Sequence, residues 1–92
     1  MIYSIRATKL FKKQYEKVLK QGKSRHKIEK VISDLAHLVK MPDEYRVHKL
    51  KGELKGMYEL HIEPDLLLIY EYRHDILILK LIRIGSHSEL FE

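Results

Sequence analysis

The spacing of apolar residues changes at Pro42, and this change limits the folds open to the chain. Before Pro42, apolar side chains recur every three or four residues, which is the spacing of an amphipathic helix. After it, apolar and polar residues alternate over 57–62, and apolar runs follow at 66–72 and 76–84. Alternation with a period of two indicates strands. The pattern predicts an α+β domain in which helices precede most of the strands.

Two helices are predicted before Pro42, preceded by a short strand over 2–6. Thr8 is a suitable N-cap for the first helix, and Gly22 is well placed to end it. Ser24 is a suitable cap for the second. The apolar stripe predicted for the second helix consists of Ile28, Val31, Ile32, Leu35, Leu38 and Val39. Because only a short turn separates the two helices, they are expected to form an αα-hairpin.

Short turns at 63–65 and 73–75 separate the three later strands. Such short connections make neighbouring strands antiparallel. The strand over 76–84 is apolar on both faces, so it is expected to be covered on both sides. We therefore expect the chain, 1–92, to form one domain with its helices on one face of a twisted antiparallel sheet of about four strands. The other face of that sheet would be open.

Side-chain parity on the first of these strands places Glu59 and His61 opposite its apolar residues. If the strands pair as their turns imply, the 63–65 turn and the end of the last strand lie near one another. That convergence gathers four residues into one concave patch: His61, Asp65, Arg83 and His87.

Two histidines, a carboxylate and an arginine suit phosphodiester chemistry on RNA. Histidine can take or give a proton near neutral pH, and arginine can donate to phosphate oxygens in the transition state. Phe91 is placed to stack on an unpaired base, and no metal or other cofactor is required. Plainer interpretations stay open: His61 as a solvent-facing residue, Asp65 as a turn former, Arg83 as a cross-strand partner of Glu59 or Asp65, and Phe91 as a core-edge residue.

Positive charge is concentrated at the start of the chain. Residues 1–30 carry a formal charge of +8 and residues 31–92 carry −3, which gives the total of +5. The first helix presents Lys9, Lys12, Lys13, Lys17 and Lys20, most of them on one face. Such a stripe can bind nucleic-acid backbone or an acidic protein, or it can be a solvated surface. The absence of cysteine excludes disulfides and thiolate metal sites, and no signal peptide or membrane span is evident, so a cytoplasmic protein is expected.

Two segments carry a resemblance to a known family: HKLKGELKGMYELHIEPDLLLIYEY (48–72) and IRIGSHSELF (82–91). They share the order H-x-L-x-G…K-G…E-x-H-I-x-P-D-x-x-L-I-Y…R-x-G-S-H-S-x-L-F. This order resembles the YafQ-type toxins of the RelE/ParE superfamily, the toxin halves of bacterial type II toxin–antitoxin pairs. The preceding strand and basic helices fit by pattern alone.

The resemblance implies a metal-independent endoribonuclease that enters the ribosomal A site and cuts mRNA. It implies that Arg83 holds the scissile phosphate and that His87 is the leading general acid or base, with His61 and Asp65 supplying or orienting the partner group. His48 and Phe91 would position the substrate, helped by Lys9, Lys12 and Lys13 against RNA. Which residue is the base and which the acid stays open. This chain departs from some relatives at Leu66, where they carry an aromatic residue.

The same resemblance implies a cognate antitoxin that binds and silences the toxin, which by itself is expected to be monomeric and to form larger oligomers through the antitoxin. No membrane partner is expected. Two alternatives remain from other classes: a non-enzymatic, ParE-like toxin that poisons DNA gyrase, and a catalytically inactive RNA- or protein-binding module.

Overall fold

Hydroxyl side chains begin both long helices. In the computed structural model, which describes residues 2–91, Thr8 Oγ1 accepts a hydrogen bond of 2.9 Å from the Phe11 amide at the start of α1 (Lys9–Lys20). Ser24 Oγ likewise accepts one of 3.2 Å from the Lys27 amide at the start of α2 (Arg25–Ala36). Both predicted caps and the αα-hairpin are confirmed.

The second helix ends earlier than its apolar pattern predicted. Leu38 adopts a left-handed conformation with φ of 58°, and the Val39 amide donates 2.9 Å back to the Asp34 carbonyl. The Leu38 amide donates a second bond of 3.1 Å to the Leu35 carbonyl. The two bonds together form a Schellman turn, which commonly ends helices. The turn rotates Leu38 and Val39 outward, where they are 46% and 49% exposed. Their predicted place in the buried stripe is therefore wrong, because a backbone reversal interrupts the helical period.

Five strands form the sheet in the order β1-β5-β4-β3-β2. Their bounds are Ser4–Ala7 for β1, His48–Lys49 for β2, Tyr58–Glu63 for β3, Leu66–Arg73 for β4 and Ile78–Gly85 for β5. Short 3-10 turns lie at Asp43–Tyr45 and Gly52–Leu54, and a short helix, α3, spans His87–Phe91. The predicted α+β class is confirmed, and β5 is an interior strand.

Three details of the sheet differ from expectation. β1 pairs with β5 in parallel. Short turns force only β3, β4 and β5 to be antiparallel neighbours, and the long connection from β1 to β5 carries no such constraint. β2 has only two residues and was not predicted. The β4–β5 turn is longer than 73–75 and includes Ile76 and Leu77, which are 56% and 41% exposed. Leu77 has φ of 53°, so the turn withdraws both residues from the predicted strand.

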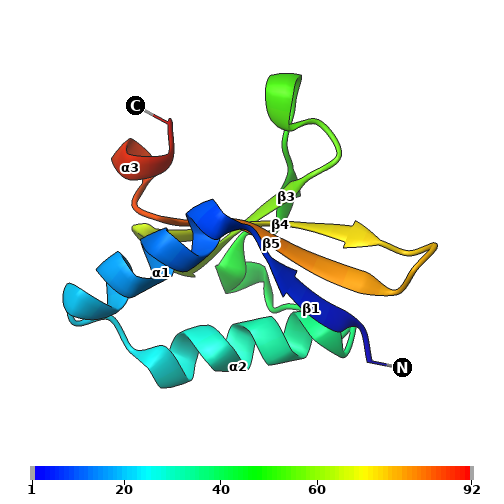
Figure 1. Cartoon of the computed structure of the whole chain (residues 1–92), viewed down its shortest axis with the longest axis horizontal. Coiled ribbons are helices and arrows are strands. Elements are labelled where there is room, and N and C mark those ends of the chain that lie inside the picture. The colour runs from blue at the N-terminus through cyan, green and yellow to red at the C-terminus, as the bar shows by residue number, and fades with distance from the viewer. Residues whose placement is uncertain (1, 92) are drawn as a thin grey trace.

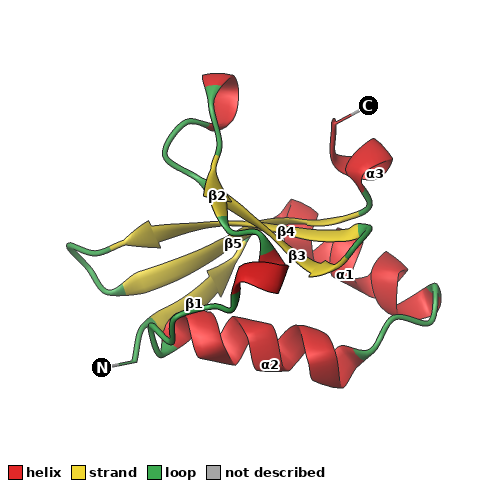
Figure 2. Ribbon diagram, turned by 180° about the vertical axis from the view of Figure 1, so that it is seen from behind, coloured by secondary structure: helices red, strands yellow, loops and turns green. Residues whose placement is uncertain are grey.

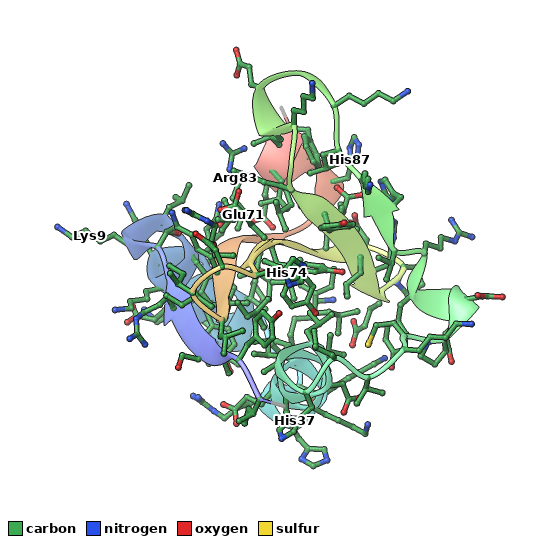
Figure 3. The ribbon with its side chains drawn as sticks, turned by 90° about the vertical axis from the view of Figure 1, so that its right-hand side faces the viewer. Lys9, His37, Glu71, His74, Arg83 and His87 are labelled. Carbon is green, nitrogen blue, oxygen red and sulfur yellow. The ribbon has the colours of Figure 1, made fainter. Side chains whose placement is uncertain are left out.

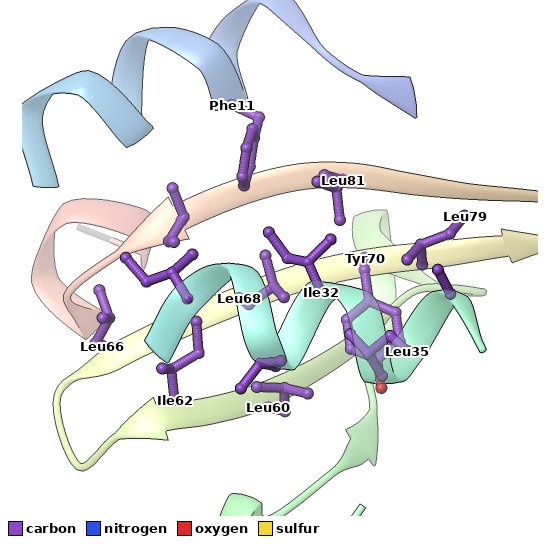
Figure 4. Packing of buried hydrophobic residues seen from close by; sticks show 14 of the residues in the cluster. Phe11, Ile32, Leu35, Leu60, Ile62, Leu66, Leu68, Tyr70, Leu79 and Leu81 are labelled. Carbon is purple, nitrogen blue, oxygen red and sulfur yellow. The ribbon is translucent and has the colours of Figure 1, made fainter. Parts of the chain in front are cut away.

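The main hydrophobic core lies between the sheet and the two long helices. Figure 1 shows α1 and α2 on the same side of the sheet, and Figure 4 shows Phe11 and Ile32 facing side chains of the strands. Leu60 and Leu79 are completely buried in this layer. Among residues 2–91, α1 and α2 are too short and too polar for a membrane crossing, as is every other helix.

The opposite face of the sheet is only partly open. Leu67, Ile69, Ile82 and Leu90 form a second, smaller cluster there, against which Leu50, Leu54 and Met57 pack. Figures 1 and 2 show α3 and the excursion that leads into β3 rising on this side, away from α1 and α2. The face that was expected to be open is thus partly covered by these two segments.

Candidate active site

A β-bulge turns Arg83 toward the partly open face. Unbroken alternation along β5 would place Arg83 beside Leu79 and Leu81, under the helices. The register instead pairs Leu81 with Tyr70 and Arg83 with Ile69. Ile69 and Tyr70 are adjacent in β4, so Ile82 is an extra residue in β5 with no partner in β4. The extra residue reverses the side-chain parity. Ile82 accordingly packs in the small cluster, and Arg83 lies on the same side of the sheet.

The strand register aligns three polar residues across the sheet: His48, Glu59 and Arg83. They are here called the polar row. His48 on β2 pairs with Glu59 on β3, Glu59 pairs with Ile69 on β4, and Ile69 pairs with Arg83 on β5. Strands are spaced about 4.8 Å apart, so the backbones of Glu59 and Arg83 are roughly 10 Å apart. This separation leaves room between the histidine side and the arginine side of the row for one phosphodiester.

Glu59 lies between two histidines, a role that the sequence reasoning missed. Its Oε1 is 3.3 Å from Nε2 of His48 and 3.8 Å from Nε2 of His61. Glu59 is only 6% exposed, and a buried carboxylate needs such partners. The alternative in which Glu59 pairs with Arg83 is not what the structure shows: Arg83 Nη1 donates 3.2 Å to the Leu90 carbonyl.

The other ring nitrogens indicate where the protons are. Nδ1 of His48 lies 2.8 Å from the Arg46 carbonyl, and Nδ1 of His61 lies 3.2 Å from the Pro64 carbonyl. Carbonyls only accept hydrogen bonds, so both Nδ1 atoms carry hydrogen. A neutral ring would then turn a lone pair on Nε2 toward Glu59. The contacts of Glu59 Oε1 with the two Nε2 atoms are therefore ion pairs only when a histidine carries a second proton.

The Pro64–Asp65 turn ties the two outer histidines to one place. His61 contacts the Pro64 carbonyl, and the Asp65 carboxylate accepts a 3.1 Å hydrogen bond from the His87 amide. His61 and His87 are thereby anchored at consecutive residues of one turn. Asp65 accordingly holds the backbone that carries His87.

α3 presents His87 and Phe91, but its formation was not predicted. The missed signal is the sequence Ser86-x-x-Glu89, the pattern of a capping box. The His87 and Phe91 rings lie 5.1 Å apart between centroids, and Phe91 is 40% exposed. Figure 3 shows His87 and Arg83 in the same part of the molecule, beside α3. The exposed ring of Phe91 is accessible to a nucleobase.

Two hollows flank the polar row. Arg83 and Phe91 line one of about 420 Å³, bordered by Lys51, Glu53, Leu54 and Leu90. His61 lines another of about 320 Å³, together with Arg46 and Lys27. Among residues 2–91, no set of three or more histidine, aspartate or glutamate side chains has the geometry to hold a metal ion.

Four further residues named in the sequence analysis lie outside the row. Lys9, Lys12 and Lys13 are exposed on α1, whose buried side packs on the helix-covered face of the sheet, and Figure 3 shows Lys9 extending outward from it. They are not brought together with the histidines. Leu66, the departure noted in the sequence, is 2% exposed and belongs to the main core.

Solved structures first place the fold in a class. The chain matches a metal-bound toxin from Helicobacter pylori with a TM-score of 0.92 and 39% identity, covering 98% of this chain and all of that one. It also matches the toxin structure in the Escherichia coli DinJ–YafQ toxin–antitoxin complex with a TM-score of 0.88 and 28% identity over both whole chains. The fold is thus that of a small bacterial toxin of the toxin–antitoxin type.

The sequence then gives the family. Residues 3–92 match the family described as the bacterial toxin of type II toxin–antitoxin system, YafQ. The mRNA interferase toxin YafQ of Escherichia coli K12 is 35% identical over 83 residues, which cover 85% of this chain and 88% of the relative. The chain belongs to the YafQ family of type II toxins.

Proposed function

We propose that this protein is an mRNA interferase toxin that cleaves mRNA in the ribosomal A site and is silenced by a cognate antitoxin. Curated relatives bear the name mRNA interferase, and a relative has been solved with its antitoxin. The observation that carries the proposal is the anchoring of His61 and His87 at one turn, with Arg83 beside the second. A phosphodiester placed there meets two proton-transfer groups and a phosphate ligand.

Cleavage would proceed by attack of an RNA 2′-hydroxyl on the neighbouring phosphorus. One group takes the hydroxyl proton, the bond from phosphorus to the 5′-oxygen breaks, and a second group protonates that oxygen. The products are a 2′,3′-cyclic phosphate and a free 5′-hydroxyl. Arg83 uses one N–H for the Leu90 carbonyl, and its other donors are available to the non-bridging oxygens as their charge grows.

The proton arrangement suggests how the roles divide. The Glu59 carboxylate faces both Nε2 atoms and would stabilise a second proton on either ring, so we assign the His48–Glu59–His61 group as the general acid. His87 is exposed on α3 and its ring lies against that of Phe91, so we assign it as the base. Asp65 orients His87 through its amide, and Phe91 stacks on the base next to the cut.

The experiment for the activity adds purified toxin to ribosomes translating a defined mRNA and maps new 5′ ends. We expect cuts at A-site codons, no cuts in the same mRNA without ribosomes, and loss of the cuts with His87→Gln. Intact transcripts on ribosomes that have stopped would refute the nuclease assignment. A parallel supercoiling assay with DNA gyrase tests the alternative target, and inhibition there would replace the proposal.

The acid assignment has its own test. A substrate with sulfur in place of the 5′-bridging oxygen has a leaving group that needs no protonation. We expect His61→Gln to lose cleavage of the ordinary substrate but to recover it on the sulfur substrate. His87→Gln should stay slow on both. The reverse pattern would exchange the two roles while leaving the activity itself intact.

A further inference from the structure

α3 is too short to be stable without external contacts. It has five residues and lies at the end of the described chain, whereas isolated helices of fewer than about 12 residues are marginal in water. Leu90 anchors it in the small hydrophobic cluster, where it is 6% exposed. One buried side chain holds the helix down but does not fix its rotation. The direction of the His87 ring must therefore be fixed by polar contacts.

Glu89 provides two such contacts, one with each carboxylate oxygen. Its Oε1 accepts 2.9 Å from the Ser86 amide, while the Glu89 amide donates 3.2 Å to Ser86 Oγ, which completes a capping box. Its Oε2 lies 2.7 Å from the Lys17 ammonium on α1. Lys17 and the Ser86 amide together lower the pKa of Glu89 to about 2, so the carboxylate is charged under all working conditions.

The backbone next to the helix is shaped around this carboxylate. A Cβ atom built on Gly85 would lie 3.2 Å from Glu89 Oε1 and 3.3 Å from a methyl carbon of Leu90. Contacts this short force the neighbour to move. On the other side of the same segment, Gln14 Oε1 of α1 accepts 3.0 Å from the Ile84 amide. α1 is thus fastened to the chain both before and within α3.

We propose that Glu89, held by Lys17, is a positioning residue that sets the orientation of His87 for catalysis. The Lys17–Glu89–Ser86 contacts, here called the α3 clamp, connect the basic helix to the catalytic histidine. The inference rests on the proposed function, because it concerns the role of His87 in cleavage. It gives Lys17 a specific task that differs from general attraction of RNA.

The test compares single-turnover cleavage by Glu89→Ala, Lys17→Met and the double variant on programmed ribosomes. Misplacing a catalytic group by a fraction of an ångström is costly, so we expect Glu89→Ala to slow cleavage on the order of ten-fold at an unchanged half-saturating ribosome concentration. Lys17→Met should give a smaller loss, and the double variant should equal Glu89→Ala. The matched control is Asp34→Ala, which removes an exposed pair with Lys30 of 2.9 Å on α2 and should cleave normally.

Amide hydrogen exchange supplies a readout that does not depend on activity. The Leu90 amide donates 3.1 Å to the Ser86 carbonyl, so its protection reports whether α3 is formed. We expect Glu89→Ala to lose that protection while amides of β4 keep theirs. The proposal would be overturned if Glu89→Ala cleaved at the wild-type rate. It would also be overturned if the variant raised only the half-saturating ribosome concentration. If the wild-type protein itself does not cleave, the proposed function fails, and unchanged exchange at Leu90 would then refute the clamp as well.

Discussion

The two faces of the sheet differ in how much they bury and in what they expose. Among residues 2–91, the helix-covered face forms a hydrophobic cluster of sixteen buried residues, whereas the cluster on the opposite face has four. The larger cluster holds apolar side chains and tyrosines, and the smaller one borders Glu59, His61 and Arg83. One face therefore supplies most of the stability and the other presents the reactive groups. Substitutions on the two faces should separate stability from cleavage.

Arg83→Ala should show the largest effect on the reactive face. Removing one preorganised donor to a developing charge typically costs about 10²–10³ in rate, and we expect a loss of cleavage of that size. The urea midpoint should change little, because Arg83 is partly exposed and makes one hydrogen bond, to the Leu90 carbonyl. Single-turnover cleavage and urea unfolding measure the two quantities.

Arg73→Ala is the matched control for this variant. Arg73 ends β4 near the far turn and lies 3.8 Å from Asp75, away from the polar row. Cleavage should be normal. An equal loss with Arg73→Ala would show that general positive charge, and not the position of Arg83 after the bulge, drives the reaction.

Leu79→Ala should show the converse on the helix-covered face. Leu79 is fully buried, and truncating such a leucine costs about 2–5 kcal/mol of unfolding free energy. Cleavage per folded molecule, measured well below the unfolding midpoint, should be unchanged. Leu90→Ala in the small cluster should cost less stability, because the small cluster surrounds it with fewer side chains, yet reduce cleavage by loosening α3. If both variants lost stability and cleavage in proportion, the two faces would not be separable.

This division explains what the sequence could predict. The helices, β3, β4 and β5 follow from periods of 3.6 and two, because a large cluster enforces those periods over many residues. The helix caps at Thr8 and Ser24 are local signals and were also predictable. The short turn at Glu63-Pro64-Asp65 was also predictable, and it places His61 and Asp65 at the end of the β3–β4 hairpin that lies next to His87.

Features of the reactive face were harder to predict because each departs from a period. The bulge at Ile82 reverses the parity of Arg83, and a strict alternation would have placed that arginine in the core. The contact between His48 and Glu59 depends on β2, a strand of two residues with almost no sequence signal. The left-handed turns at Leu38 and Leu77 occur at residues that rarely adopt positive φ, so composition gave no warning.

Glu59→Gln should sharpen the comparison within the reactive face. The amide keeps the shape but cannot stabilise an additional proton on the histidines, so we expect cleavage to fall by a factor on the order of ten. The substrate with 5′-bridging sulfur should restore it. Glu71→Gln is the control, since Glu71 follows Ile69 on the same face of β4 and its backbone pairs with Lys80. A loss that the sulfur substrate does not restore would mean that Glu59 serves folding, not proton transfer.

The smallest expected effect concerns the stability that Glu89 adds at the edge of the reactive face. Lys17 and the Ser86 amide hold the folded-state pKa of Glu89 at about 2, below its ordinary value of 4.5. The carboxylate therefore contributes stability that is fully present above pH 4.5 and is lost as the pH falls toward 2. Because exposed ion pairs contribute only about 0.2–1 kcal/mol, the change in urea midpoint should be small.

The measurement is the difference in urea midpoint between wild type and Glu89→Gln at a series of pH values from 2 to 6. The difference should be greatest above pH 4.5 and should shrink steadily toward pH 2, where about half of the folded molecules carry a protonated Glu89. In a Lys17→Met background it should be smaller at every pH, because the largest cause of the lowered pKa is gone. A difference that stayed constant with pH would show that Glu89 acts through packing and not through its charge. In that case the link between α1 and α3 would be steric, and the two faces of the sheet would be coupled by contact alone.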